Sequence, residues 1–359
     1  VRIYNRVNRN NDGFHFVSCE NVHVSNCDVQ CQDDACAMFG SCRKITVTNS
    51  SFSTRWSVFR LGGGDPSDIT ISNCVIYETY GCPIKMTFGP ESRAENILFS
   101  NIVMDDVTGP ISIGLGKKTV TAGFDRADVT GPVSKSLAED SRQEAAPNKP
   151  SRRGYVRNIT FNGLRARVIA NGRQFPDIPF VQDYRSGETR QCIALNCITD
   201  SFIEGITFQD VHVTYAGGGT LQEANRTIPA VVGEYYERGT PPAYGLYARR
   251  VRGLTLNNVR FETELPDLRP AVVFDHVADA ALTGLSAQGN KKAMALLRFF
   301  YASDVLVTAA RVLSPAAVFL RVEGYSSRNI VVDGGDLSKA ATVSELKGGA
   351  KIDTVKLRA

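Results

Sequence analysis

Short runs in which β-branched and polar residues alternate recur along most of the chain, and the clearest of them close on an asparagine. Four such runs end at Asn26, Asn49, Asn73 and Asn101, which are 23, 24 and 28 residues apart. Weaker copies lie at residues 158–162, 205–210, 253–258, 304–307 and 329–332, listed in chain order. Alternation with a period of two predicts β-strands, and a repeat of about 22 to 28 residues without helical periodicity is typical of a solenoid.

The length of the repeat favours an all-β fold, a right-handed parallel β-helix, over the other repeat folds. Leucine-rich repeats are the obvious competitor, but the chain lacks their Leu-x-x-Leu-x-Leu signature. Stacked coils place equivalent residues about 4.8 Å apart. We therefore expect the repeated asparagines to form a ladder of side-chain amides that satisfies backbone groups at a turn.

We expect one β-helix domain over residues 1–359, with excursions near residues 116–153 and 216–245. Long loops on a solenoid often wall a binding cleft, although the first excursion is equally consistent with a disordered or decorative loop. The second excursion carries aromatic side chains that favour either a packed or a sugar-stacking loop, namely Tyr235, Tyr236, Tyr244 and Tyr247. Because the chain begins at Val1 inside an expected strand, we expect a longer precursor with further N-terminal coils.

Composition restricts the class of partner. The chain is 43% hydrophobic and 22% charged, as is ordinary for a globular protein, and its formal net charge is +4. It lacks basic blocks interleaved with aromatic residues, so nucleic acid is not an expected partner. It also lacks an apolar run near the roughly 20 residues that cross a bilayer, so no membrane span is expected. We expect a monomer.

Seven of the nine cysteines fall in the first quarter of the chain, at positions 19, 27, 31, 36, 42, 74 and 82. They lack the matched pairs and histidine partners of a zinc site, so a metal is not favoured. Buried packing residues and one or two disulfides remain the two interpretations. The odd count implies at least one free thiol.

Alignment of the coils brings three aspartates together, because Asp12 lies 21 residues before Asp33 and 22 before Asp34. Carboxylates this close repel one another and raise the pKa of at least one, which suits a general acid beside an ionised base. The same alignment predicts two columns of inward-facing side chains. The first consists of Phe14, Cys36, Phe59 and Ile84, and the second of Phe16, Met38, Leu61 and Met86. It places His15, Ala37, Arg60 and Lys85 in one outward column.

Carboxylates for proton transfer beside cations for substrate carboxylates indicate a site that cleaves a sugar bond in an acidic polysaccharide. The alternative interpretation is a solvated acidic turn next to a salt-bridged surface. Three aspartates at matched repeat positions favour the site.

At these residues the chain resembles the polygalacturonase family, glycoside hydrolase family 28, over most of its length. The family's Asn-Thr-Asp-Gly, Gly-Asp-Asp and Arg-Ile-Lys are similar to residues 10–13, 32–34 and 83–85. The resemblance implies a β-helix of the pectin-lyase type that needs no cofactor. It implies that Asp33 protonates the leaving oxygen, that Asp12 and Asp34 activate the attacking water, and that Lys85 binds a substrate carboxylate. It also implies inversion, for which the carboxyl groups stand roughly 6.5–9.5 Å apart.

Two positions depart from the family pattern. Thr-Arg-Trp at residues 54–56 replaces Gly-His-Gly, and Pro83 stands where the family has a substrate-binding arginine. Arg55 or Arg60 is a candidate anion-binding replacement, because guanidinium pairs bidentately with carboxylates. Trp56 is a candidate for stacking on a sugar ring.

His15 neighbours the acids, where it is either a substrate or proton partner or a structural residue. Residues 242–247 and 267–272 resemble a bacterial branch of the family that tends to lack the histidine. We therefore predict altered substrate choice rather than loss of activity.

The sequence predicts an inverting glycoside hydrolase of a pectin-like polysaccharide, galacturonan or rhamnogalacturonan, acting in the periplasm or outside the cell. One alternative is a calcium-dependent β-helix lyase, in which the aspartates bind Ca²⁺ and Arg60 or Lys85 removes the proton next to a uronate carboxylate. The other is a β-helix that binds carbohydrate without cutting it.

Overall fold

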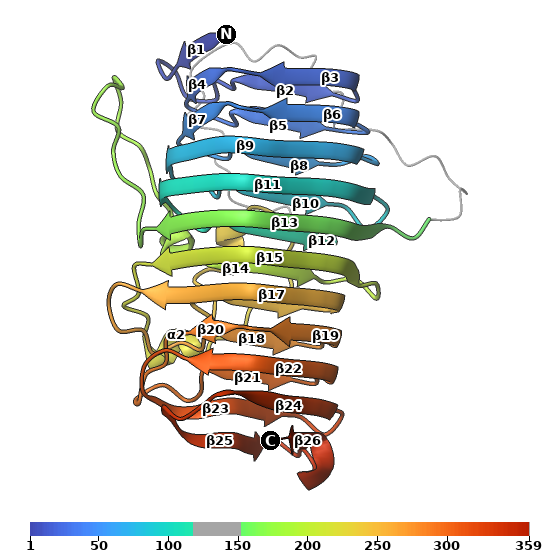
Figure 1. Cartoon of the computed structure of the whole chain (residues 1–359). Helices are drawn as coiled ribbons and strands as arrows, with labels where there is room; N and C mark the ends of the chain where they lie inside the picture. Colours follow the sequence, from blue (N-terminus) through green and yellow to red (C-terminus); the bar gives the residue numbers. More distant parts are fainter. Residues whose placement is uncertain (118–151, 359) are drawn as a thin grey trace.

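The computed structural model describes residues 1–117 and 152–358, and within them the chain winds into stacked coils that build two long parallel sheets (Figure 1). The 15-stranded sheet comprises β1 (Arg2–Asn5), β3 (Glu20–Ser25), β4 (Asp28–Cys31), β6 (Arg43–Thr48), β7 (Ser51–Thr54), β9 (Ser67–Thr79), β11 (Arg93–Val107), β13 (Tyr155–Val168), β15 (Ile203–Tyr215), β17 (Val251–Thr263), β19 (Ala278–Thr283), β20 (Ser286–Ala287), β22 (Ser303–Val312), β24 (Arg328–Asp336) and β26 (Val355–Arg358).

The 11-stranded sheet comprises β2 (Phe14–Val17), β5 (Cys36–Phe39), β8 (Phe59–Gly62), β10 (Ile84–Phe88), β12 (Ile111–Leu115), β14 (Ile193–Cys197), β16 (Leu246–Arg249), β18 (Val272–Asp275), β21 (Leu297–Phe300), β23 (Ala316–Glu323) and β25 (Ala340–Lys347). The described helices are short: η2 (Ser186–Glu188), α2 (Leu221–Ala224), η3 (Tyr235–Arg238) and η4 (Ile352–Thr354). The expected parallel β-helix is confirmed.

The register predicted for the first coils is also confirmed. His15 pairs with Ala37, Ala37 with Arg60 and Arg60 with Lys85 on successive strands of the 11-stranded sheet. Because side chains alternate between the two faces of a strand, a slip by one residue would have exchanged the inward and outward columns. The repeat therefore fixes which side chains face outward at these coils.

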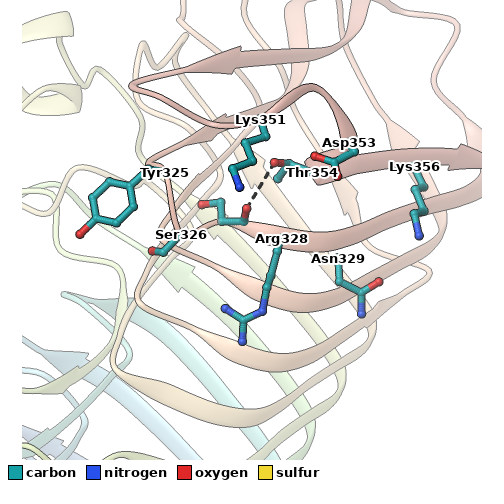
Figure 2. A pocket seen from close by; sticks show the side chains of 9 residues that line it. Tyr325, Ser326, Arg328, Asn329, Lys351, Asp353, Thr354 and Lys356 are labelled. Carbon is teal, nitrogen blue, oxygen red and sulfur yellow. Dashed lines mark hydrogen bonds between the residues drawn. The ribbon is translucent and has the colours of Figure 1, made fainter.

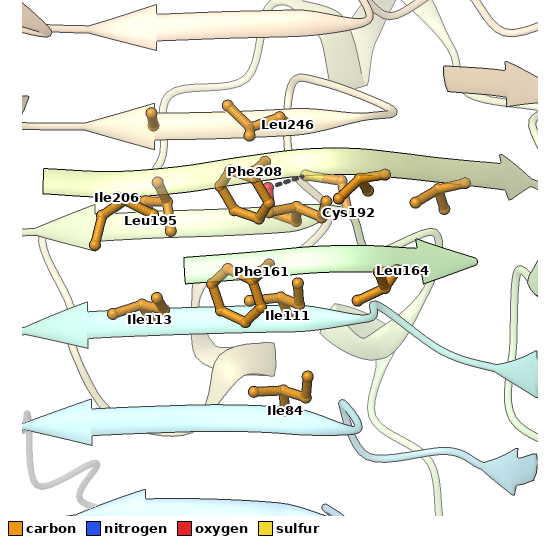
Figure 3. Packing of buried hydrophobic residues seen from close by; sticks show 14 of the residues in the cluster. Ile84, Ile111, Ile113, Phe161, Leu164, Cys192, Leu195, Ile206, Phe208 and Leu246 are labelled. Carbon is orange, nitrogen blue, oxygen red and sulfur yellow. Dashed lines mark hydrogen bonds between the residues drawn. The ribbon is translucent and has the colours of Figure 1, made fainter. Parts of the chain in front are cut away.

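Equivalent apolar side chains stack between the two sheets and form the core. The rings of Phe99, Phe161 and Phe208, on β11, β13 and β15, stack with centroids 5.0 Å apart at each step. Figure 3 shows Phe161 and Phe208 beside aliphatic side chains of the 11-stranded sheet, among them Ile113 and Leu195. Burial of this stacked interior is the main force that holds successive coils together.

The four repeated asparagines occupy a corner where the backbone adopts positive φ, from 50° at Asn49 to 55° at Asn26. Asparagine tolerates this left-handed conformation better than most residues. Side-chain amides do stack there, since Asn101 Nδ2 donates to Asn73 Oδ1 at 3.1 Å. That hydrogen bond joins two side chains, whereas the sequence led us to expect bonds to the backbone.

Residues 216–245 leave the stack as expected and contain α2 and η3 but no strand. Most of the other expected excursion, residues 118–151, lies outside the described residues. A third excursion, residues 169–192 between β13 and β14, was not anticipated. It extends back along the first coils (Figure 1), where Tyr4 donates a hydrogen bond of 2.6 Å to Asp177.

All nine cysteines lie within the described residues and are free, and only Cys19 is not buried. Packing is therefore the role that the structure gives them, rather than disulfide formation. In the part of the chain that the structure describes, no helix is long and apolar enough to cross a membrane.

Candidate active site

The three aspartates, Asp12, Asp33 and Asp34, lie at one corner of the β-helix, in the turns that lead into β2 and β5. Gly13 N donates to the backbone oxygen of Asp34 at 3.0 Å, so the two turns are bonded directly. A Cβ atom at Gly13 would meet the Ala35 carbonyl oxygen at 2.3 Å. The close approach of the two acidic turns therefore requires glycine at this position.

Asp33 has the electrostatic character of a general acid. Burial raises its pKa to about 7, helped by the negative charges of Asp34 and Asp12 and opposed by the positive charge of Lys85. A carboxyl group with this pKa holds its proton for part of the time at neutral pH and can donate it to a leaving oxygen.

The other two aspartates have different partners. The pKa of Asp12 is raised by burial, an effect that a hydrogen bond from the His15 ring opposes, and the charge of Asp34 adds to the rise. Asp12 Oδ2 and His15 Nδ1 are in direct contact. Asp34 is buried, and its Oδ1 accepts a hydrogen bond of 3.2 Å from the backbone nitrogen of Ser57. The corner thus brings Asp33, whose pKa is raised to about 7, together with two further aspartates that have different hydrogen-bond partners.

Arg60 on β8 and Lys85 on β10 form the cationic part of the site, in register on adjacent strands. Both side chains are nevertheless buried, at 5% and 4% exposure. Lys85 Nζ donates to Glu234 Oε2 at 2.7 Å, and Arg60 Nη2 lies 3.8 Å from Glu234 Oε1. The structure therefore places a carboxylate of the protein where the sequence led us to expect a carboxylate of the substrate.

The segment that carries Glu234 is anchored by aromatic residues of η3. Tyr235 and Tyr236 pack against Cys82 and Trp56 in a small apolar cluster. Tyr244 is buried as well, and so is Tyr247, which lies on β16 and not in the excursion. The tyrosines of the second excursion therefore pack the loop onto the β-helix instead of offering open rings to a sugar.

Arg55 lies in a buried ion pair with Glu188, a residue of the unanticipated excursion, at 3.0 Å. Its guanidinium lies 4.3 Å from the centre of the Trp56 ring, and that ring is 6.2 Å from the ring of Tyr236. Tyr235 donates to the same Glu188 carboxylate at 2.7 Å. Arg55 and Trp56 thus hold the two excursions against the coils next to the aspartates.

The sequence reasoning missed Glu188 and Glu234. Glu234 is 149 residues from its partner Lys85, and Glu188 is 133 residues from Arg55. Neither acid belongs to a repeat, so no periodic signal identifies its neighbour. The only available signal was that Glu234 directly precedes the tyrosines of the second excursion.

A cavity of about 380 Å³ lies at the other end of the chain, lined by residues of β24, η4 and β26 and of the turn before β24 (Figure 2). Its lining includes Arg328, Lys351 and Lys356 but a single carboxylate, Asp353. It therefore lacks the paired acids that glycoside hydrolysis requires, and the corner with the aspartates remains the candidate site.

Comparisons with known proteins match the first coils of the chain. Residues 2–121, which hold the three aspartates and both cations, match the family model described as Glycosyl hydrolases family 28. Among curated proteins, the chain is 29% identical over 112 residues to "Polygalacturonase QRT2" of Arabidopsis thaliana, covering 29% of this chain and 25% of that protein. It is also 29% identical over 111 residues to "Polygalacturonase" of Persea americana, covering 29% of this chain and 24% of that protein.

The matched segment spans about a quarter of the length of these curated relatives. No solved structure matches the chain. The similarity to glycosyl hydrolases family 28 thus covers residues 2–121, the part of the parallel β-helix that holds the three aspartates.

Proposed function

We propose that the protein hydrolyses glycosidic bonds in a pectin-like polysaccharide and inverts the anomeric centre. Asp33 acts as the general acid, and Asp12 and Asp34 activate the attacking water. The observation that carries the proposal is the juxtaposition of Asp33, whose pKa is raised to about 7, with two further aspartates on adjacent coils. Most glycoside hydrolases use two carboxyl groups whose pKa values differ, so that one donates a proton while the other is ionised.

Arg55 and Trp56 are positioning residues in this proposal. The Arg55–Glu188 ion pair is buried, which favours a role in holding the walls of the site rather than in contacting the substrate. With Arg55 where family 28 has a histidine, we propose a divergent, bacterial type of enzyme with altered substrate choice. A polymeric substrate further implies a periplasmic or extracellular enzyme, which fractionation of the source cells would test.

The test incubates the protein with polygalacturonan, rhamnogalacturonan and pectin oligosaccharides, with and without a calcium chelator. New reducing ends without ultraviolet absorbance support hydrolysis, and proton NMR of the first product reports the anomeric configuration. Asp33→Asn is expected to lower kcat by about 10²- to 10⁴-fold while substrate binding persists.

Three outcomes contradict the proposal. Ultraviolet absorbance that disappears with the chelator identifies a calcium-dependent lyase. Binding that is identical in the wild type and Asp33→Asn, without any product, identifies a carbohydrate-binding β-helix. Retention of the anomeric configuration contradicts the inverting mechanism.

A further inference from the structure

Two buried cations side by side need an anion. Arg60 and Lys85 are directly in register, and like charges in that arrangement repel one another. Within the described residues, Glu234 is the acid that forms ion pairs with both of them. Its carboxylate reaches the outward face of the sheet from the 216–245 excursion, the side from which a ligand would approach.

Glu234 is held in this position by its neighbours. The next residue, Tyr235, is buried at 1% exposure, and its hydroxyl donates to Glu188 at 2.7 Å. The Glu234 side chain itself is 31% exposed, whereas the Lys85 side chain beneath it is 4% exposed. The carboxylate therefore forms the solvent-facing cover of the cationic pair.

We propose that Glu234 takes the place of a substrate carboxylate, so that the sugar unit bound beside Lys85 is an uncharged one. The inference rests on the proposed function, because it specifies the substrate of the same site. A uronate unit at this position would have to displace Glu234 or bring a second carboxylate against cations that are already paired. The preferred polymer therefore has an uncharged unit at this position and is not built of uronate alone.

Binding is measured in the Asp33→Asn background, so that the ligands are not consumed. The probes are trigalacturonate, with a carboxylate on every unit, and an alternating rhamnose–galacturonate tetrasaccharide, each titrated by calorimetry. We expect the alternating oligosaccharide to bind more tightly. Adding Glu234→Gln to the Asp33→Asn protein leaves Arg60 and Lys85 free to pair with a uronate carboxylate. The affinity for trigalacturonate, relative to that for the tetrasaccharide, is then expected to rise by about tenfold or more.

Glu223→Gln is the matched control. Glu223 belongs to the same excursion and forms an ion pair with Arg190 instead of the β8 and β10 cations. Its substitution removes the same charge and is expected to leave the ratio of the two affinities unchanged. Glu234→Ala repeats the test with more space beside Lys85, and thermal unfolding verifies that each variant is folded.

The inference is overturned if Asp33→Asn binds trigalacturonate as tightly as the alternating ligand, if both Glu234 variants leave the affinity ratio unchanged, or if no variant binds either ligand. Hydrolysis by the wild type is measured separately with the same two ligands. A changed affinity ratio without any hydrolysis would reject the proposed function and keep the assignment of Glu234.

Discussion

Cations occur at both ends of the outward column of the 11-stranded sheet, but their charges are balanced in different ways. In the last coils, Arg298 donates to Glu323 and Arg321 to Glu345, each at 2.8 Å and each about one coil apart. The two cations are in register in both regions, but in the first coils Arg60 and Lys85 depend on a single acid outside the repeat, Glu234.

The contrast separates structural pairs from the candidate site. A solenoid balances charge most simply between neighbouring coils, as in the last coils, where one repeat supplies the arginine and the next supplies the glutamate. Like charges in register are unfavourable unless an acid balances them, and in the last coils Arg298 and Arg321 each have their own glutamate within the repeat. In the first coils the two cations share one acid that the repeat does not supply, which favours a role beyond folding. The positive charge of Lys85 also lowers the pKa of Asp33, which links the cationic pair to the candidate active site.

The largest expected effect is on the pH dependence of catalysis in the first coils. Since the pKa of Asp33 is about 7, its acid form is lost as the pH rises through 7, and kcat/KM should fall by up to about tenfold per pH unit above that point. Asp12, Asp34 and Lys85 are the charged groups that act on Asp33, and Glu234 and Arg60 adjoin Lys85. Initial rates across the pH range test this, and a flat alkaline profile would contradict it.

The same contrast extends to stability against pH. Because the pKa of Asp33 is raised in the folded state, its contribution to stability is full below its ordinary value of 3.8 and is lost as the pH rises toward 7. Glu345 behaves in the opposite sense: hydrogen bonds from Lys347 and Arg321 lower its pKa, so its contribution is lost as the pH falls. In Asp33→Asn the free energy of unfolding should therefore decrease less between acid and neutral pH than it does in the wild type. Glu345→Gln should not reduce this decrease.

A smaller effect is expected on stability at neutral pH. Glu234→Gln leaves two buried cations without their carboxylate and should lower the free energy of unfolding by about 2 kcal/mol. Glu345→Gln breaks a more exposed pair and should cost less than about 1 kcal/mol. Urea unfolding compares the two variants. The double variant Glu234→Gln/Lys85→Met should recover part of the lost free energy of unfolding, because it removes one of the two facing positive charges. If Glu234→Gln and Glu345→Gln lowered the free energy of unfolding equally, the charge pairs of the first and last coils would not differ in their contribution to stability.

The fold and the register of the first coils followed from the sequence because a solenoid repeats its inward residues, so that Phe14, Cys36 and Phe59 align without knowledge of the structure. Contacts outside the repeat could not be predicted in this way. Glu188 and Glu234 reach the site on excursions whose paths depend on packing against distant coils. Burial of the cysteines also had to come from the structure, because their spacing was equally consistent with disulfides.

The smallest expected effect concerns the corner where the first coils use asparagine. In the last coils the equivalent position is Ala309, which is exposed and has a φ of 52°, between Gly284 and Gly334 on neighbouring coils. An alanine in the left-handed conformation costs roughly 1–2 kcal/mol, and glycine avoids that cost but gains freedom in the unfolded chain. Ala309→Gly should therefore stabilise the protein by about 0.5 kcal/mol. Asn101→Ala introduces the same strain and removes the side-chain hydrogen bond to Asn73, so it should destabilise the protein by about 1 kcal/mol. Urea unfolding of both variants measures the difference, and a loss of stability in Ala309→Gly would show that this corner in the last coils carries no strain to relieve.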